Sequence, residues 1–246
     1  MLHIDLLIRR GFLIDKKNGS FYLSNNSHSK DREYLSKLLA KYDLGFIADE
    51  DQVIITNDNE AAINKLKEIF RPVEMGTVGV GTCSQWRSWT YHVAKRDHAD
   101  KLPVSWLEAN IAAYIKALSA SGIYTSGCCD GNHPGCYKLF IDFDGPVYCE
   151  YHKCLWEHLL NPLFSLNWDD SYRSIDLTEN RQQQYDGLFR ASQFIYNHRW
   201  NLIDLRMDSA SWMKKSTIKH MDQDVIKDRF LSETIKNLKS DKYFKL

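Results

Sequence analysis

The chain has 246 residues, of which 43% are hydrophobic and 26% charged, and its 32 lysines and arginines balance 32 aspartates and glutamates. This size and apolar content suffice for one large or two small domains with buried cores, and the zero formal charge excludes a strongly basic protein that coats nucleic acid or a membrane surface. No run of about 18 apolar residues is present, and the stretch MLHIDLLIRR lacks the cleavage site of a signal peptide, so we expect a soluble cytoplasmic protein without a membrane partner.

Residues 1–72 are predicted to form a small α+β module of hairpins and two helices. The pair Asn18-Gly19 lies between two β-prone runs, which is typical of a hairpin turn, and a second hairpin is expected from 46–48 and 53–56. Apolar and aromatic side chains recur at helical spacing in two stretches: Tyr34, Leu35, Leu38, Leu39 and Tyr42, then Ile63, Leu66, Ile69 and Phe70. Pro72 disfavours helix in the residue before it and therefore ends the module.

Residues 73–84, which include MGTVGVGTC, are predicted to be a glycine-rich loop or linker, and residues 85–246 a larger main domain. The first marked helix of that domain is expected to begin with the S-x-x-E capping box of Ser105 and Glu108 and to end at Gly122. Strands are expected at 123–125 and 138–143, and helices over 147–160, from Thr178 to about Trp200, and over 225–238. The sequence therefore predicts an α+β protein, in which an α/β-to-helical domain has a short sheet and a mostly helical C-terminal third.

The segment 125–154 holds five of the six cysteines and two of the nine histidines. In a reducing compartment, clustered cysteines are free thiols or metal ligands more often than disulfides. Zinc takes four ligands in a tetrahedron, often as two close pairs, and His133-x2-Cys136 and Cys149-x2-His152 are two such pairs. One hypothesis is therefore a zinc site made of these four residues, with three spare ligands: Cys128, Cys129 and Cys154. The alternative is that the cysteines fill the core and the histidines lie at the surface.

An Asp-x-Asp pair ends the apolar run KLFIDFDG, residues 138–145. This stretch resembles the first motif of the haloacid dehalogenase superfamily. The resemblance implies that Asp142 attacks phosphorus, that Asp144 acts as acid and base, and that magnesium lies between the phosphate and the carboxylates. Pro146 departs from the Thr or Val usual after the glycine, and the rest of the chain is predicted to be helical rather than βαβ. The alternative is a turn at Asp144-Gly145-Pro146, with Asp142 facing water.

The stretch GFLIDKKNGSF, residues 11–21, resembles the signature of LAGLIDADG homing endonucleases, and the helix, hairpin and helix after it resemble the rest of such a half-domain. That family places its metal-binding aspartate just before the glycine, where this chain has Asn18, so the resemblance implies the shape rather than the catalytic site. A Lys-Asn-Gly hairpin accounts for the same residues without common ancestry.

Aromatic and basic side chains are interleaved in QWRSWTYHVAKRDH, residues 85–98. A surface of this composition stacks on bases and holds phosphate groups. Five residues are the predicted ligand contacts: Trp86, Arg87, Trp89, His92 and Arg96. The alternative is one buried helical face that contains both tryptophans.

Two functional hypotheses follow. The first is a non-catalytic intracellular binding protein for a phosphate-bearing ligand, either nucleotide or nucleic acid, or for a partner protein, with zinc stabilising the cysteine-rich segment. The second is a magnesium-dependent phosphohydrolase or nuclease that uses Asp142 and Asp144. We expect the first hypothesis, because it requires the fewest features that are missing from the sequence.

Overall fold

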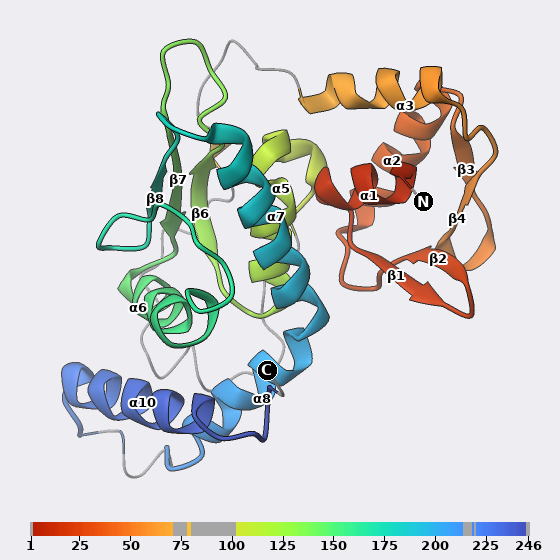
Figure 1. Cartoon of the computed structure of the whole chain (residues 1–246). Coiled ribbons are helices and arrows are strands. Elements are labelled where there is room, and N and C mark those ends of the chain that lie inside the picture. Colours follow the sequence, from red (N-terminus) through yellow and green to blue (C-terminus); the bar gives the residue numbers. More distant parts are fainter. Residues whose placement is uncertain (1, 71–77, 80–101, 214–217, 219, 245–246) are drawn as a thin grey trace.

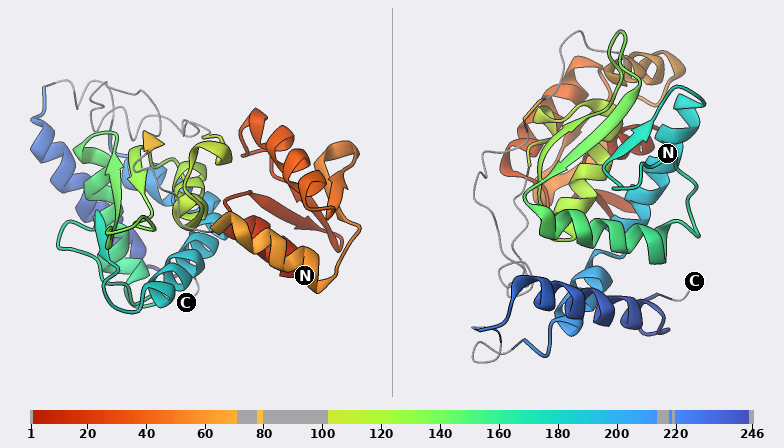
Figure 2. Two further views of the ribbon diagram at one scale, coloured as in Figure 1. Left: turned by 90° about the horizontal axis from the view of Figure 1, so that it is seen from above. Right: turned by 90° about the vertical axis from the view of Figure 1, so that its left-hand side faces the viewer.

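The computed structural model of the chain describes residues 2–70, 78–79, 102–213, 218 and 220–244. The fold is α+β, as predicted, and the described residues form two hydrophobic cores. One core is formed mainly by residues 4–66 and the other mainly by residues 102–244. Each core also contains a residue from the other part of the chain, because Val104 packs into the first and Leu13 into the second. Figures 1 and 2 show the two units side by side.

The first unit alternates helices and hairpins. Its elements are α1 (Leu2–Arg9), β1 (Ile14–Lys17), β2 (Ser20–Leu23), α2 (Ser29–Lys41), β3 (Gly45–Ile47), β4 (Gln52–Ile55) and α3 (Glu60–Leu66), with short 3-10 turns at Asp49–Asp51 and Lys67–Phe70. The four strands form an antiparallel sheet in the order β1-β2-β4-β3. Asn18 and Gly19 have φ angles of 51° and 83°, the left-handed pair that a two-residue hairpin turn requires, so this predicted hairpin is confirmed.

The second unit combines a twisted sheet with helices. Its elements are a 3-10 turn (Val104–Trp106), α5 (Ala109–Ala120), β6 (Thr125–Cys129), β7 (Lys138–Phe143), α6 (Pro146–Leu155), a π-helical turn (Trp156–Leu160), β8 (Ser174–Asp176), α7 (Arg181–Asn197), α8 (Arg199–Ser209) and α10 (Gln223–Leu238). With β5 (Val78–Gly79), the strands form an antiparallel sheet in the order β5-β6-β7-β8. Figure 1 shows α5 and α7 between this sheet and the first unit. In the part of the chain that is described, no helix is long and apolar enough to cross a membrane.

Two predicted helix starts are wrong. Helix α5 begins at Ala109 rather than near Ser105, and its N-cap is Glu108, whose side chain makes no capping bond because it accepts the backbone N–H of Asp130 at 2.6 Å. Thr178 does not cap α7, whose N-cap is Asn180. The Thr178 hydroxyl and amide instead donate to the Asp176 carboxylate at 2.6 and 2.8 Å.

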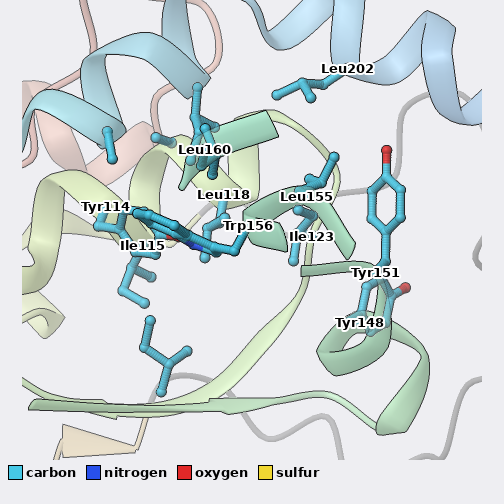
Figure 3. Close-up of a cluster of buried hydrophobic side chains, with 14 of the residues drawn as sticks. Tyr114, Ile115, Leu118, Ile123, Tyr148, Tyr151, Leu155, Trp156, Leu160 and Leu202 are labelled. Atoms are coloured by element: carbon cyan, nitrogen blue, oxygen red, sulfur yellow. The ribbon is translucent and has the colours of Figure 1, made fainter. Parts of the chain in front are cut away.

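Helix α5 is buried among aromatic side chains of the second core. Tyr114, Ile115 and Leu118 are at most 1% exposed and lie with Trp156, which is fully buried, in the cluster of Figure 3. The indole Nε1 of Trp156 donates to the Tyr114 hydroxyl at 2.6 Å, so these two buried polar groups are paired as burial requires. The cluster holds α5 rigidly, and α5 in turn positions residues at the junction of the two units.

A buried ion pair joins the two units. Lys116 of α5 and Asp31 of α2 are each 1% exposed and lie 2.7 Å apart. The other carboxylate oxygen of Asp31 accepts the Val104 N–H at 2.7 Å, and Lys116 also donates to the Leu102 carbonyl. Removing one partner of such a pair costs about 3–5 kcal/mol because the other charge is left buried. The two units also approach each other closely at Gly11, where an added Cβ would lie 2.8 Å from the Cβ of Ala112. The relative position of the two units is therefore fixed.

Candidate functional site

Asp142 and Asp144 have different surroundings at the end of β7. Asp142 is about half exposed and forms an ion pair with Arg173. Asp144 is 5% exposed, and its backbone N–H donates to the Tyr124 carbonyl at 3.2 Å. Every strand pair in the described residues is antiparallel, so the βαβ arrangement implied by the resemblance to haloacid dehalogenases is not found there. Neither aspartate belongs to the one group of metal-ligating side chains found among the described residues.

The four predicted zinc ligands do not come together in the structure. His133 and Cys136 lie in the connection between β6 and β7, whereas Cys149 and His152 lie on α6. His152 points into the aromatic core, where its Nε2 is 2.7 Å from the Tyr114 hydroxyl and accepts the Trp156 indole N–H at 3.1 Å. Burial lowers the pKa of His152 to about 3, so this imidazole is neutral and serves packing.

A different group converges at the N-terminus of α5. One ligand atom from each of Glu108, Cys129 and His133 lies within 4.8 Å of the other two. The Nε2 of His133 is 3.0 Å from the Oε1 of Glu108, and these side chains are 9% and 5% exposed. Burial raises the pKa of Glu108, and burial raises the pKa of the Cys129 thiol to about 12. Without a bound cation, the thiol is therefore protonated at neutral pH.

Local hydrogen bonds shape this group. Asp130 follows directly after β6, and its Oδ1 accepts the backbone N–H of Asn132 at 2.8 Å, which closes a tight turn around Gly131. Gly131 has a φ of +70°, and a Cβ there would lie 2.8 Å from the backbone of Lys138, so the turn requires glycine. The Oδ2 of Asp130 accepts two hydrogen bonds from Asn110, one from the backbone N–H at 3.2 Å and one from the side-chain Nδ2 at 3.0 Å. These bonds tie the loop after β6 to the first turn of α5.

The sequence pattern missed Glu108 and gave Cys129 only a secondary role. Glu108 was expected to cap a helix, and Cys129 was only a spare ligand beside the predicted His133 and Cys136. The spacing Cys129-x3-His133 is a sequence signal for a pair of zinc ligands, because a short turn brings two residues at this spacing together. No local signal indicates Glu108, since its position depends on contacts with the loop after β6.

A cleft of about 590 Å³ lies between the two units, near this group. It is lined by residues of α1, of the turn after α3, of α5 and of α7: Asp5, Leu6, Arg9, Lys67, Phe70, Asn110, Gln182, Asp186, Phe189 and Gln193. The Arg9 guanidinium lies 4.4 Å from the centre of the Phe189 ring, and its Nη1 is 2.5 Å from the Oδ1 of Asp186. At the rim, the Nδ2 of Asn132 donates to the Phe70 carbonyl at 3.1 Å. Both units therefore contribute to the walls.

The five predicted ligand contacts, Trp86, Arg87, Trp89, His92 and Arg96, lie outside the described residues. They remain predictions.

Comparison with protein-family models, with curated proteins and with solved structures finds no significant match.

Proposed function

We propose that the protein is a non-catalytic binding protein that holds a nucleotide in the cleft between its two units. The observation that carries this proposal is the cleft itself, whose volume of about 590 Å³ is in the range of small-molecule sites. The buried pair of Lys116 and Asp31 fixes the units on either side, so the cleft exists before the ligand arrives. A preformed site does not spend binding free energy on ordering its own walls.

The side chains in the cleft suit the parts of a nucleotide. Lys67 supplies a cationic donor for phosphate oxygens, and the Arg9 guanidinium, whose Nη1 is paired with Asp186, keeps further N–H groups for charge-assisted hydrogen bonds of this kind. Phe70 supplies an aromatic face on which a base can stack, whereas the Arg9 guanidinium covers one face of the Phe189 ring. Carboxamide groups offer both donors and acceptors for base edges and sugar hydroxyls, and three line the cleft: Asn110, Gln182 and Gln193. The volume favours a mononucleotide over a protein partner, which would need a much larger surface.

The catalytic alternative has less support. A phosphoryl-transfer site would present Asp142 and Asp144 together to a metal ion, but the Asp142 carboxylate is paired with Arg173 and Asp144 is buried. The cleft also contains no group of three metal-ligating side chains among the described residues. Binding without turnover is therefore the function that the geometry supports best.

Calorimetric titration of the 246-residue chain with AMP, GMP, adenosine and guanosine tests the proposal. We expect the nucleotides to bind more tightly than the nucleosides. Lys67→Ala should weaken nucleotide binding about 3- to 10-fold, since it removes an ionic donor that is partly screened by water, and should leave nucleoside binding unchanged.

Lys37→Ala is the matched control, because Lys37 is an exposed lysine of α2 that pairs with Glu33 and does not line the cleft. Its nucleotide affinity should equal that of the unaltered protein. No binding at millimolar nucleotide, or equal affinities in Lys67→Ala and Lys37→Ala, would contradict the proposal.

A further inference from the structure

We propose that Glu108, Cys129 and His133 bind one zinc ion. The three side chains offer a carboxylate oxygen, a sulfur and an imidazole nitrogen within 4.8 Å of one another. They come from two places in the chain that are brought together only by the fold: Glu108 is the N-cap of α5, whereas Cys129 ends β6 and His133 lies in the loop that follows it. This site is independent of the nucleotide cleft, so either proposal can fail alone.

The set of donors matches zinc. Zinc binds thiolate, imidazole and carboxylate ligands, and its bonds to them are about 2.0–2.3 Å long. Two ligands of a tetrahedral zinc ion are therefore roughly 3.3–3.8 Å apart. The present separation of 3.0 Å between His133 and Glu108, and the 4.8 Å limit for the whole group, are within a small side-chain rotation of that geometry. A fourth ligand, a water molecule in the simplest case, completes the tetrahedron.

Backbone N–H groups already orient two of the ligands. The Oε2 of Glu108 accepts the Asp130 N–H at 2.6 Å, which leaves Oε1 on the side of His133. The Sγ of Cys129 accepts the Gly131 N–H at 3.4 Å. Such outer contacts orient metal ligands and are usual around metal centres in proteins.

The loop after β6 is hydrogen-bonded both to α7 and to the first unit. The Tyr185 hydroxyl of α7 donates to the Asp130 carbonyl at 2.7 Å, and Asn132 donates to Phe70 of the first unit. A metal ion would thus join α5 to a loop that itself contacts α7 and the first unit. Because the three ligands meet only in the folded chain, the free energy of zinc binding adds to the free energy of folding. The inferred role of the ion is to stabilise the fold.

The experiment begins with protein purified without a histidine tag and without added metal, then incubated with one equivalent of Zn²⁺ and desalted. Mass spectrometry of metal content should give about one zinc per chain. Cys129→Ser should lower zinc affinity by about 100-fold or more, because it removes a direct ligand rather than an outer contact. Cys149→Ser is the matched control, since Cys149 is a partly buried cysteine of the same segment that lies outside the group, and it should keep the ion.

Glu108→Gln keeps an oxygen for the Asp130 N–H and removes the charge, so it tests the site even if Cys129→Ser does not fold. Its zinc affinity should fall by about 10-fold or more. Substitution of Co²⁺ should give a thiolate-to-cobalt charge-transfer band in the unaltered protein and in Cys149→Ser, but not in Cys129→Ser. No zinc retained by the unaltered protein, or zinc lost from Cys149→Ser and kept by Glu108→Gln, would overturn the assignment.

Discussion

His133 and His152 lie in the same cysteine-rich segment, but their imidazole rings have opposite surroundings. His133 is on a loop, 3.0 Å from a carboxylate oxygen and close to a thiol. His152 is on α6, where the rings of Phe143 and Trp168 lie 4.7 and 5.5 Å from it between centroids. The first ring has the neighbours of a metal ligand, and the second has the neighbours of a core residue.

This difference shows which part of a ligand pattern is informative. Cys149-x2-His152 has the helical spacing of a ligand pair, and the two residues do lie on one helix. The helix, however, turns the imidazole of His152 toward Tyr114 and Trp156, which already bond to its Nε2. Spacing along the chain predicts which side chains share a face, whereas the elements packed against that face decide whether a metal can reach them.

The largest predicted effect is a difference in the free energy of unfolding between alanine variants of the two histidines. His152→Ala should destabilise the protein by about 3 kcal/mol or more, because it leaves a cavity among buried aromatic rings and removes a hydrogen-bond acceptor. Its zinc content should not change. His133→Ala should show the converse: zinc is lost, and in the presence of a chelator the free energy of unfolding falls by less than in His152→Ala, although Glu108 loses its partner.

Urea denaturation with and without chelator, together with metal analysis, measures both quantities for both variants. Zinc lost from His152→Ala while its fold is retained would remove the distinction between the two rings.

We expect acid to lower the stability of the protein through the buried ring of His152. The pKa of His152 is lowered by burial to about 3, whereas an unfolded histidine titrates near 6.5. Below pH 6.5 the unfolded chain therefore binds a proton that the folded chain does not. Stability from this residue is complete above pH 6.5 and decreases by about 1.4 kcal/mol for each pH unit down toward 3.

Comparison with His152→Phe isolates this contribution, because the carboxylates that also titrate in acid are common to both proteins. The variant should lose less stability than the unaltered protein between pH 6 and pH 4.5, when both are measured with chelator present. The control is His158→Gln, which alters an exposed histidine at the next turn and should keep the unaltered slope. Equal slopes in all three proteins would mean that the ring of His152 is charged in the folded state.

Local patterns predicted the elements well and the site poorly. The turn at Asn18-Gly19 and the helices α2, α6 and α10 follow from turn chemistry and apolar spacing, both of which act over a few residues. Glu108 also fits a local pattern, the capping box, but its carboxylate is held by Asp130, 22 residues away. The cleft has no sequence signature, because its walls come from residues between Asp5 and Gln193 that meet only after folding.

The smallest effect tests the hydrogen bonds that hold His152 in the core. Tyr114→Phe removes a hydroxyl that lies 2.7 Å from His152 Nε2 and accepts the Trp156 N–H at 2.6 Å. The indole N–H keeps an acceptor, since it is also 3.1 Å from the same Nε2, so no buried donor is left unpaired. We therefore expect a loss of only about 1 kcal/mol, measured by urea denaturation. A loss as large as that of His152→Ala would instead show that the hydroxyl, more than the packing of the ring, keeps His152 in the core and away from the ligand group.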